Sequence, residues 1–131
     1  MGVRQGSRAF FANAPEKVIA AIGLPVLEIG ENLDGDYDYI HAFSITRAEM
    51  DQVFPTLKSH LRPSGMLWLS WPKGRRLGSD LVLPTVIEIG YHHGLVESTC
   101  LAIDPTWAAL KFTHPKKGKT YHNSYGTLPK E

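Results

Sequence analysis

The sequence has a single cysteine, Cys100, among its 131 residues. One thiol excludes an internal disulfide bond and any zinc site built from several cysteines. Cys100 lies in the apolar run from Thr99 to Ile103, and a free cysteine in such a run usually packs as a small hydrophobic side chain. We therefore expect Cys100 to be buried and to have no chemical role.

An excess of one charge is also absent, because 14 basic and 13 acidic residues leave a formal net charge of +1. Such a balance gives no long-range attraction to nucleic acid or to anionic lipid. The basic residues Lys73, Arg75 and Arg76 fit a solvated loop better than a phosphate-binding surface, since no aromatic platform accompanies them. We expect no nucleic-acid partner.

Long hydrophobic runs are missing as well. No stretch approaches the roughly 18 apolar residues that a membrane span needs, and the first residues contain no apolar signal segment. We therefore expect a cytoplasmic protein that does not associate with a membrane.

Short motifs that carry chemistry are not found. There is no H-E-x-x-H, no G-x-S-x-G and no G-x-x-x-x-G-K-[ST]. The adjacent His92 and His93 would point in different directions on a helix, so they do not form a metal-binding pair. Asp34, Asp36 and Asp38 alternate, but they lack the glycine and the distal glutamate of a calcium loop. We assign no catalytic residue and no metal site.

What is present is an alternation of short apolar runs with helical patterns. Strands are predicted over Arg8–Ala12, 26–29, Tyr37–Phe43, Met66–Trp71, 95–103 and Trp107–Thr113, and helices over Glu16–Ile22, 46–61 and about 80–94. This order predicts a three-layer α/β fold with a mostly parallel sheet and helices on both faces. The closing hairpin adds one antiparallel strand. We expect one domain over residues 1–114 and a polar, basic tail over residues 115–131.

The stretch from Tyr37 to Pro72 reads as one complete strand–helix–strand unit. Thr46 and Glu49 have the spacing of a capping box, and Pro55 predicts a kink or a break near Phe54. Residues 62–65, with the sequence Arg-Pro-Ser-Gly, predict a turn.

Two further predictions concern the residues after this unit. Ser79 or Asp80 is expected to cap a helix whose apolar face includes Leu83. Lys111 is expected to be a charge that protects an edge strand from pairing with another chain.

Several segments together resemble known families. They are Asn13-Ala14-Pro15-Glu16, Thr46-Arg47-Ala48-Glu49, Leu67 to Lys73, Gly94-Leu95-Val96, and Ala102-Ile103-Asp104 through Trp107 to Phe112. From about Arg8 to Phe112 the chain resembles the small bacterial family called domain of unknown function 3052, which has no assigned activity. More broadly it is similar to a truncated form of the methyltransferase-like Rossmann fold, with the segments 38–43 and 61–69 in the fourth and fifth strand positions.

One difference from that fold concerns the cofactor. A methyltransferase that uses S-adenosylmethionine carries a glycine-rich turn after its first strand, so that the backbone can approach the ligand. Here the turn is Asn13-Ala14-Pro15-Glu16, without glycine, and the acidic residue after the second strand would be Glu28 or Glu31. We therefore expect no cofactor, with S-adenosylmethionine as the alternative.

Ligands of open α/β sheets bind beyond the carboxyl ends of the strands, where the strand order reverses. The candidate ligand-binding residues at these ends are Asn13, Pro15, Ser44, Thr46, Trp71 and Lys73. Each also has a structural interpretation, because Asn13 and Thr46 fit helix caps and Trp71 fits a side chain packed under a loop. Both interpretations stay open at this point.

The predicted function is that of a non-enzymatic or degenerate methyltransferase-like domain that binds a small molecule or a partner in this crevice. Two alternatives are kept. One is an active, compact S-adenosylmethionine-dependent methyltransferase, and the other is an interaction module that forms a homodimer.

Overall fold

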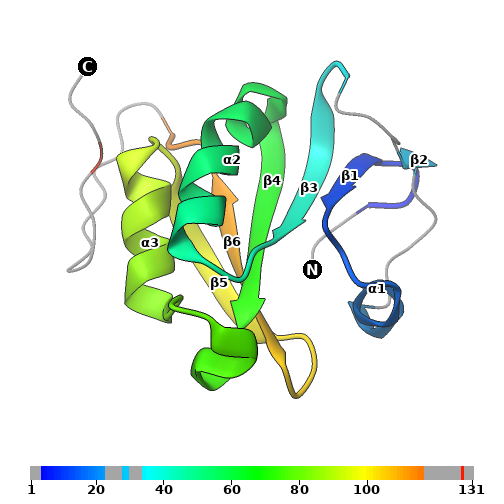
Figure 1. Ribbon diagram of the computed structural model, residues 1–131. Coiled ribbons are helices and arrows are strands. Elements are labelled where there is room, and N and C mark those ends of the chain that lie inside the picture. Colours follow the sequence, from blue (N-terminus) through cyan, green and yellow to red (C-terminus); the bar gives the residue numbers. More distant parts are fainter. Residues whose placement is uncertain (1–3, 23–27, 30–33, 117–127, 129–131) are drawn as a thin grey trace.

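A computed structural model describes residues 4–22, 28–29, 34–116 and 128 (Figure 1). Its elements in chain order are β1 (Arg8–Ala12), α1 (Glu16–Ile22), β2 (Glu28–Ile29), β3 (Tyr37–Phe43), α2 (Arg47–Ser59), β4 (Leu61–Pro72), the 3₁₀ segment η1 (Lys73–Gly78), α3 (Leu83–His92), β5 (Val96–Ala102) and β6 (Trp107–Thr113). The predicted order of strands and helices is confirmed. The second strand is described only at Glu28–Ile29, and most of the predicted tail lies outside the described residues.

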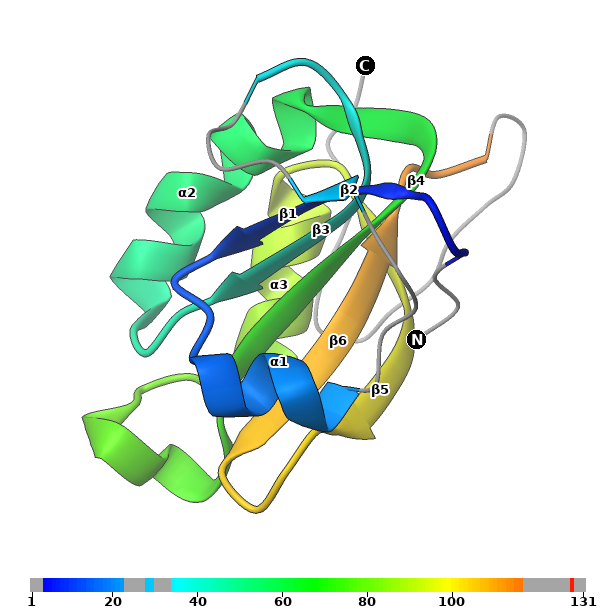
Figure 2. The ribbon, with the colours of Figure 1, turned by 90° about the vertical axis from the view of Figure 1, so that its right-hand side faces the viewer.

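The strands form one sheet in the order β2-β1-β3-β4-β6-β5. The pairs β1–β2, β1–β3 and β3–β4 are parallel, whereas β6 runs antiparallel to both β4 and β5. Helices α2 and α3 cover one face, and α1 lies on the other (Figures 1 and 2). The predicted α/β fold with one antiparallel strand from the closing hairpin is therefore confirmed. No helix of the described segments is long and apolar enough to cross a bilayer.

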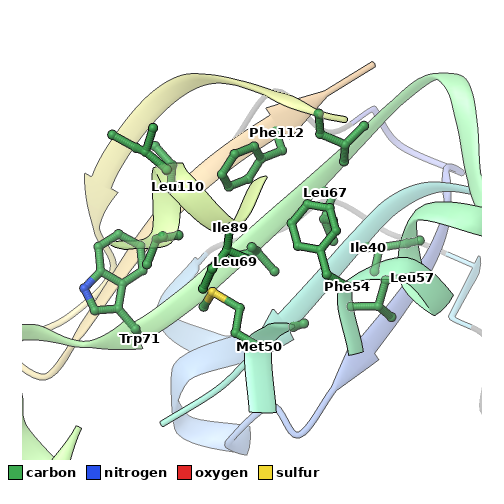
Figure 3. Close-up of a cluster of buried hydrophobic side chains, with 14 of the residues drawn as sticks. Ile40, Met50, Phe54, Leu57, Leu67, Leu69, Trp71, Ile89, Leu110 and Phe112 are labelled. Atoms are coloured by element: carbon green, nitrogen blue, oxygen red, sulfur yellow. The ribbon is translucent and has the colours of Figure 1, made fainter. Parts of the chain in front are cut away.

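The larger part of the core lies between the sheet and helices α2 and α3. Figure 3 shows these buried side chains: Ile40, Leu67, Leu69, Trp71, Leu110 and Phe112 from the strands, and Met50, Phe54, Leu57 and Ile89 from the helices. On the other face, a smaller cluster joins Val18 of α1 to Phe43 and Trp107. Since both faces are covered, the strands read as continuous apolar runs.

Helix α2 begins with a variant of the predicted capping box. Thr46 Oγ1 accepts a hydrogen bond from the backbone N–H of Glu49 at 3.2 Å, as predicted. The Glu49 carboxylate accepts from the N–H of Ile45 at 3.2 Å, one residue earlier than in the standard motif. A third acceptor comes from outside the helix, because Asp80 binds the N–H of Arg47 at 2.7 Å. The first turn is thus fixed to the loop after β4.

Pro55 does not end α2, which runs without interruption from Arg47 to Ser59. The predicted break near Phe54 is wrong. Met50, Phe54 and Leu57 are buried along one side of the helix, and packing of this apolar face outweighs the loss of one backbone hydrogen bond at an exposed proline.

Residues 62–65 do not form a separate turn, so that prediction is wrong. They belong to β4, in which Leu61 pairs with Tyr37 and Met66 pairs with Tyr39. Four residues of β4 therefore stand opposite one residue of β3, as a large bulge. The proline and glycine of this segment are accommodated inside a strand rather than between two elements.

Neither Ser79 nor Asp80 caps α3, whose N-cap is Val82 without a side-chain hydrogen bond. Proline in the first turn defines the start of this helix instead. Ser79 Oγ donates to the carbonyl of Ile45 at 2.6 Å. Leu83 was predicted to lie on the buried face of this helix. It is 38% exposed, so that prediction is wrong.

The hairpin folds with the opposite strand at the edge from the one expected. In the sheet that the described residues form, β5 is the edge strand and β6 lies between β4 and β5. Cys100 on β5 is exposed rather than buried, although partial burial still raises the pKa of its thiol. Lys111 lies on the inner strand β6, so its predicted role as an edge charge is wrong.

Candidate functional site

A pocket of about 460 Å³ opens at the carboxyl ends of β1 and β3. It is lined by Asn13, Pro15, Phe43, Ser44, Ile45, Glu49, Gln52, Val53 and Trp107. From β1 the chain continues to β2 on one side, and β3 lies on the other side of β1. The pocket therefore lies where the strand order reverses, which is the usual ligand position in open α/β sheets.

The turn between β1 and α1 forms one wall. Asn13 has a φ of 58°, in the left-handed region that favours glycine. Asparagine is one of the few other residues that adopt this region readily. The turn after β1 thus has a glycine-like backbone at Asn13 although its sequence contains no glycine.

The end of β3 supplies the floor. Ser44 is 3% exposed, and its N–H donates to the carbonyl of Ser70 at 3.0 Å, which extends the pairing of β3 and β4 past Phe43. Glu49 reaches this segment through its bond to the N–H of Ile45. These contacts fix the backbone from Phe43 to Ile45 beside the pocket.

An aromatic pair closes the pocket on the α1 side of the sheet. The rings of Phe43 and Trp107 meet edge to face, with centroids 5.2 Å apart and planes at 76°. Trp107 is the first residue of β6, and the Asp104 carboxylate accepts hydrogen bonds from the N–H groups of Thr106 and Trp107 at 2.8 and 2.6 Å. This bonded turn sets the place of the indole.

The charge of the lining is one-sided. Among the lining residues that the structure describes, the only ionisable side chain is the carboxylate of Glu49, and none is lysine, arginine or histidine. A phosphate or carboxylate ligand would have no charged partner there and would be repelled by Glu49. The pocket therefore suits a neutral or positively charged molecule.

The six residues predicted from the sequence separate into two groups. Asn13, Pro15 and Ser44 line the pocket. Their role in binding a ligand stays a prediction, and the pocket is where that ligand would lie. Thr46 caps α2. Trp71 is 4% exposed and lies in the core beneath α2 and α3 (Figure 3), where its side chain packs rather than stacks on a ligand.

Lys73, the sixth of these residues, begins η1 and is not part of the pocket lining. Its N–H donates to the carbonyl of Thr106 at 2.7 Å. This bond ties the end of β4 to the turn before β6.

Other lining residues were missed. The sequence pattern identifies Phe43 and Trp107 only as strand residues, and Glu49 only as part of a helix cap. The available signal was position, because each lies within a few residues of a strand end at the same edge of the sheet. Gln52 and Val53 reach the pocket from the middle of α2, and no local pattern distinguishes them from other helix residues.

Sequence reasoning also missed a buried chain of polar side chains. The Tyr39 hydroxyl lies 2.6 Å from Nδ1 of His41, and Nε2 of His41 lies 2.6 Å from Oγ of Ser70. All three residues are fully buried. Burial lowers the pKa of His41 to about 3, so the imidazole is neutral, and it raises the pKa of Tyr39. Within the described part of the chain, no three histidine, cysteine or acidic residues gather to hold a metal ion.

No family model matches the chain, and no curated protein matches it. Solved structures do. A ribosomal-protein methylase from Lactobacillus delbrueckii subsp. bulgaricus aligns with a TM-score of 0.60 and 13% identity over 88% of this chain and 73% of that one. A magnesium protoporphyrin IX methyltransferase from Synechocystis, with bound SAM, aligns with a TM-score of 0.60 and 12% identity over 85% and 71%. A TehB-like SAM-dependent methyltransferase from Corynebacterium glutamicum gives 0.54 and 12% over 86% and 83%. The chain therefore has the Rossmann-like fold of these methyltransferases.

Proposed function

We propose that the protein is a small-molecule-binding domain that takes a neutral or positively charged ligand in the pocket between Asn13, Ser44 and Trp107. The observation that carries this proposal is the pocket itself, which lies at the reversal of strand order and has an aromatic wall and one carboxylate among its described lining residues. Such a combination of apolar surface and few polar groups is typical of small-molecule sites.

S-adenosylmethionine is the first ligand to test. The related methyltransferase from Synechocystis holds SAM in a structure of the same fold. The sulfonium of S-adenosylmethionine is a positive charge, which Glu49 would attract and the rings of Phe43 and Trp107 would favour through their electron-rich faces. Its adenine is a flat group that an aromatic wall can accommodate.

The residue types that line the pocket favour ligand binding without catalysis. A general acid or base is usually histidine, an acidic residue, lysine, tyrosine or cysteine. Among the described lining residues, Glu49 alone is of these types, and its carboxylate already accepts a hydrogen bond from the N–H of Ile45. The domain would thus bind its ligand as a sensor, carrier or regulatory module.

The test is calorimetric titration with S-adenosylmethionine, S-adenosylhomocysteine and ATP. The first two should bind, and ATP, with its phosphates, should not. Glu49→Gln keeps the cap of α2 but removes the charge, so it should weaken S-adenosylmethionine roughly fivefold and leave the less positive S-adenosylhomocysteine nearly unchanged. Glu88→Gln, which removes an exposed carboxylate of α3 paired with Arg47 outside the pocket, is the matched control. Absence of both heat and thermal stabilisation at millimolar concentrations of both adenosyl ligands would refute these ligands, and tight binding of ATP would refute the charge argument.

An active methyltransferase is the second candidate, and the backbone of Asn13 favours it. A left-handed residue after β1 gives the turn the conformation that glycine provides in cofactor sites. Asn13→Gly should keep this turn and strengthen S-adenosylmethionine binding by removing a side chain from the pocket wall. Formation of S-adenosylhomocysteine in the presence of a mixture of cellular small molecules, lost in Trp107→Ala, would support activity. Binding without any turnover would favour the first candidate.

Membership in the family called domain of unknown function 3052 is part of the same proposal. It rests on the resemblance of the segments around Asn13, Thr46 and Trp107. An alignment in which members keep the pocket residues Asn13, Ser44 and Trp107 more strictly than exposed positions would support it. Free variation at these three positions would count against a shared ligand.

A further inference from the structure

The polar chain Tyr39–His41–Ser70 is a feature that packing alone does not require. Its three side chains lie on the α1 side of the sheet and join β3 to β4 beside the backbone hydrogen bonds. Apolar side chains of similar size could fill a buried space without the desolvation of polar groups. A buried network in which every polar group has a hydrogen-bond partner instead favours one specific arrangement of its side chains.

The chain fixes the plane of the His41 ring. Burial keeps this imidazole neutral, and a neutral imidazole has one donor nitrogen and one acceptor nitrogen. Whichever tautomer is present, Tyr39 binds one nitrogen and Ser70 binds the other. With both ends held at 2.6 Å, the ring cannot turn about its side-chain bonds without losing a hydrogen bond.

The ring of His41 is in direct contact with the pocket wall. It stacks on Phe43 with centroids 4.4 Å apart and planes at 18°, because residues 41 and 43 point to the same face of β3. Phe43 in turn meets Trp107 edge to face at 5.2 Å. Phe43 and Trp107 both line the pocket, whereas His41 and Ser70 do not.

We infer that Tyr39, His41 and Ser70 are positioning residues, whose hydrogen-bonded chain holds Phe43 and Trp107 in the orientation that shapes the ligand pocket. Ser70 acts at two points, since its carbonyl also binds the N–H of Ser44 on the pocket floor. The inference rests on the proposed function for its ligand, but the orientation of the two rings can be measured without one.

Tyr39→Phe and Ser70→Ala test this inference, because each removes one hydroxyl and keeps the shape of the core. The matched control is Tyr91→Phe, which removes another buried tyrosine hydroxyl, bonded to Glu97 at 2.9 Å in the opposite layer. Proteins labelled with 5-fluorotryptophan report on the three tryptophans by ¹⁹F NMR. Trp107→Phe identifies the Trp107 signal, and Trp71, in the core beneath α2 and α3, serves as the internal reference.

Both variants should shift or broaden the Trp107 signal and leave that of Trp71 in place, and they should weaken S-adenosylhomocysteine about fivefold. Tyr91→Phe should change neither the signal nor the affinity. An unchanged Trp107 signal in both folded variants would overturn the inference, whatever the ligand result. If the Trp107 signal responds but neither adenosyl compound binds the unmodified protein, the choice of ligand fails and the positioning role stands.

Discussion

The side chain of Asp38, on the strand β3, accepts hydrogen bonds from residues of two other strands. Its carboxylate accepts from the N–H of Arg8 at 3.0 Å and from the Arg62 guanidinium at 2.8 Å to each oxygen. Arg62 lies in the bulge of β4, so this one carboxylate joins the start of β1 to the irregular part of β4. The contact gives the bulge a definite place on the sheet.

The pKa of Asp38 follows from these contacts. Partial burial raises it, but the hydrogen bonds from Arg8 and Arg62 and the charge of Arg62 together hold it below the ordinary value of 3.8. A carboxyl group with a lowered pKa stabilises the fold above its unfolded pKa and loses this contribution as the pH falls through its folded pKa. Its stabilisation is therefore complete at neutral pH and disappears in strong acid.

Asp38→Asn should lower the free energy of unfolding by about 1 kcal/mol at pH 7, because the partner Arg62 is partly exposed. The difference from the unmodified protein should shrink below pH 4 and vanish near pH 2. Urea denaturation at several pH values measures it, with the exposed Asp36→Asn as the control. A difference that stays constant from pH 7 to pH 2 would contradict the assignment.

At the scale of elements, the approach of α3 to β6 depends on Gly90. A side chain at this position would overlap the ring of Phe112, which is fully buried. Glycine inside a helix costs about 1 kcal/mol relative to alanine, but here it lets the helix lie directly on the ring. The close packing of α3 on β6 thus requires a residue without a side chain at position 90.

Gly90→Ala should destabilise the protein by about 1–3 kcal/mol, since overpacking of a dense core outweighs the gain in helix propensity. Phe112→Leu in the same background should recover part of this loss. A double-mutant cycle by chemical denaturation gives the coupling between the two positions, which should exceed about 1 kcal/mol. Additive effects of the two substitutions would show that the helix shifts away from the ring.

The sequence predicts most elements well where the signal is local. Tyr37–Phe43 and Trp107–Thr113 were placed to the residue, because apolar runs there end at turn-forming residues. The predicted break at Pro55 and the predicted turn at residues 62–65 are wrong because tertiary packing overrides local breakers. The strand at the sheet edge was misjudged because the order of hairpin strands is not a local property, and this misplaced Cys100 and Lys111.

The site was predictable only in outline. Strand ends and the rule for α/β sheets give Asn13, Pro15 and Ser44. The partnership of His41 with Ser70 joins residues 29 positions apart, and no periodicity reports which buried polar groups will meet. The same limit applies to Gln52 and Val53, which face the pocket because of how α2 lies on the sheet.

At the scale of the molecule, the sheet order predicts a gradient of local stability. Strands β3 and β4 are paired on both sides, whereas β5 is paired on one side in the sheet of described residues. Local opening costs most free energy where backbone hydrogen bonds and buried contacts are densest. Stability should therefore follow the position of a strand in the sheet and not its position in the chain.

Native-state hydrogen exchange measures this gradient residue by residue. Amides of β3 and β4 should exchange only through global unfolding, and the outward-facing amides of β5 should exchange much faster. Uniform protection of β5 at the level of β3 would contradict the edge position and would indicate a further strand or a second chain paired with it.

The loop from Gly74 to Gly78 is exposed throughout and is fastened at both ends. Before it, the N–H of Lys73 binds the carbonyl of Thr106, and after it Ser79 Oγ binds the carbonyl of Ile45. Because both ends of the loop are held, we expect that its length can change without shifting the strands of the sheet. This segment, after the end of β4 (Figure 1), is therefore a suitable place to insert additional residues. A longer sequence inserted there would emerge next to Ile45, at the rim of the pocket, and could give the same scaffold a new specificity without altering its core.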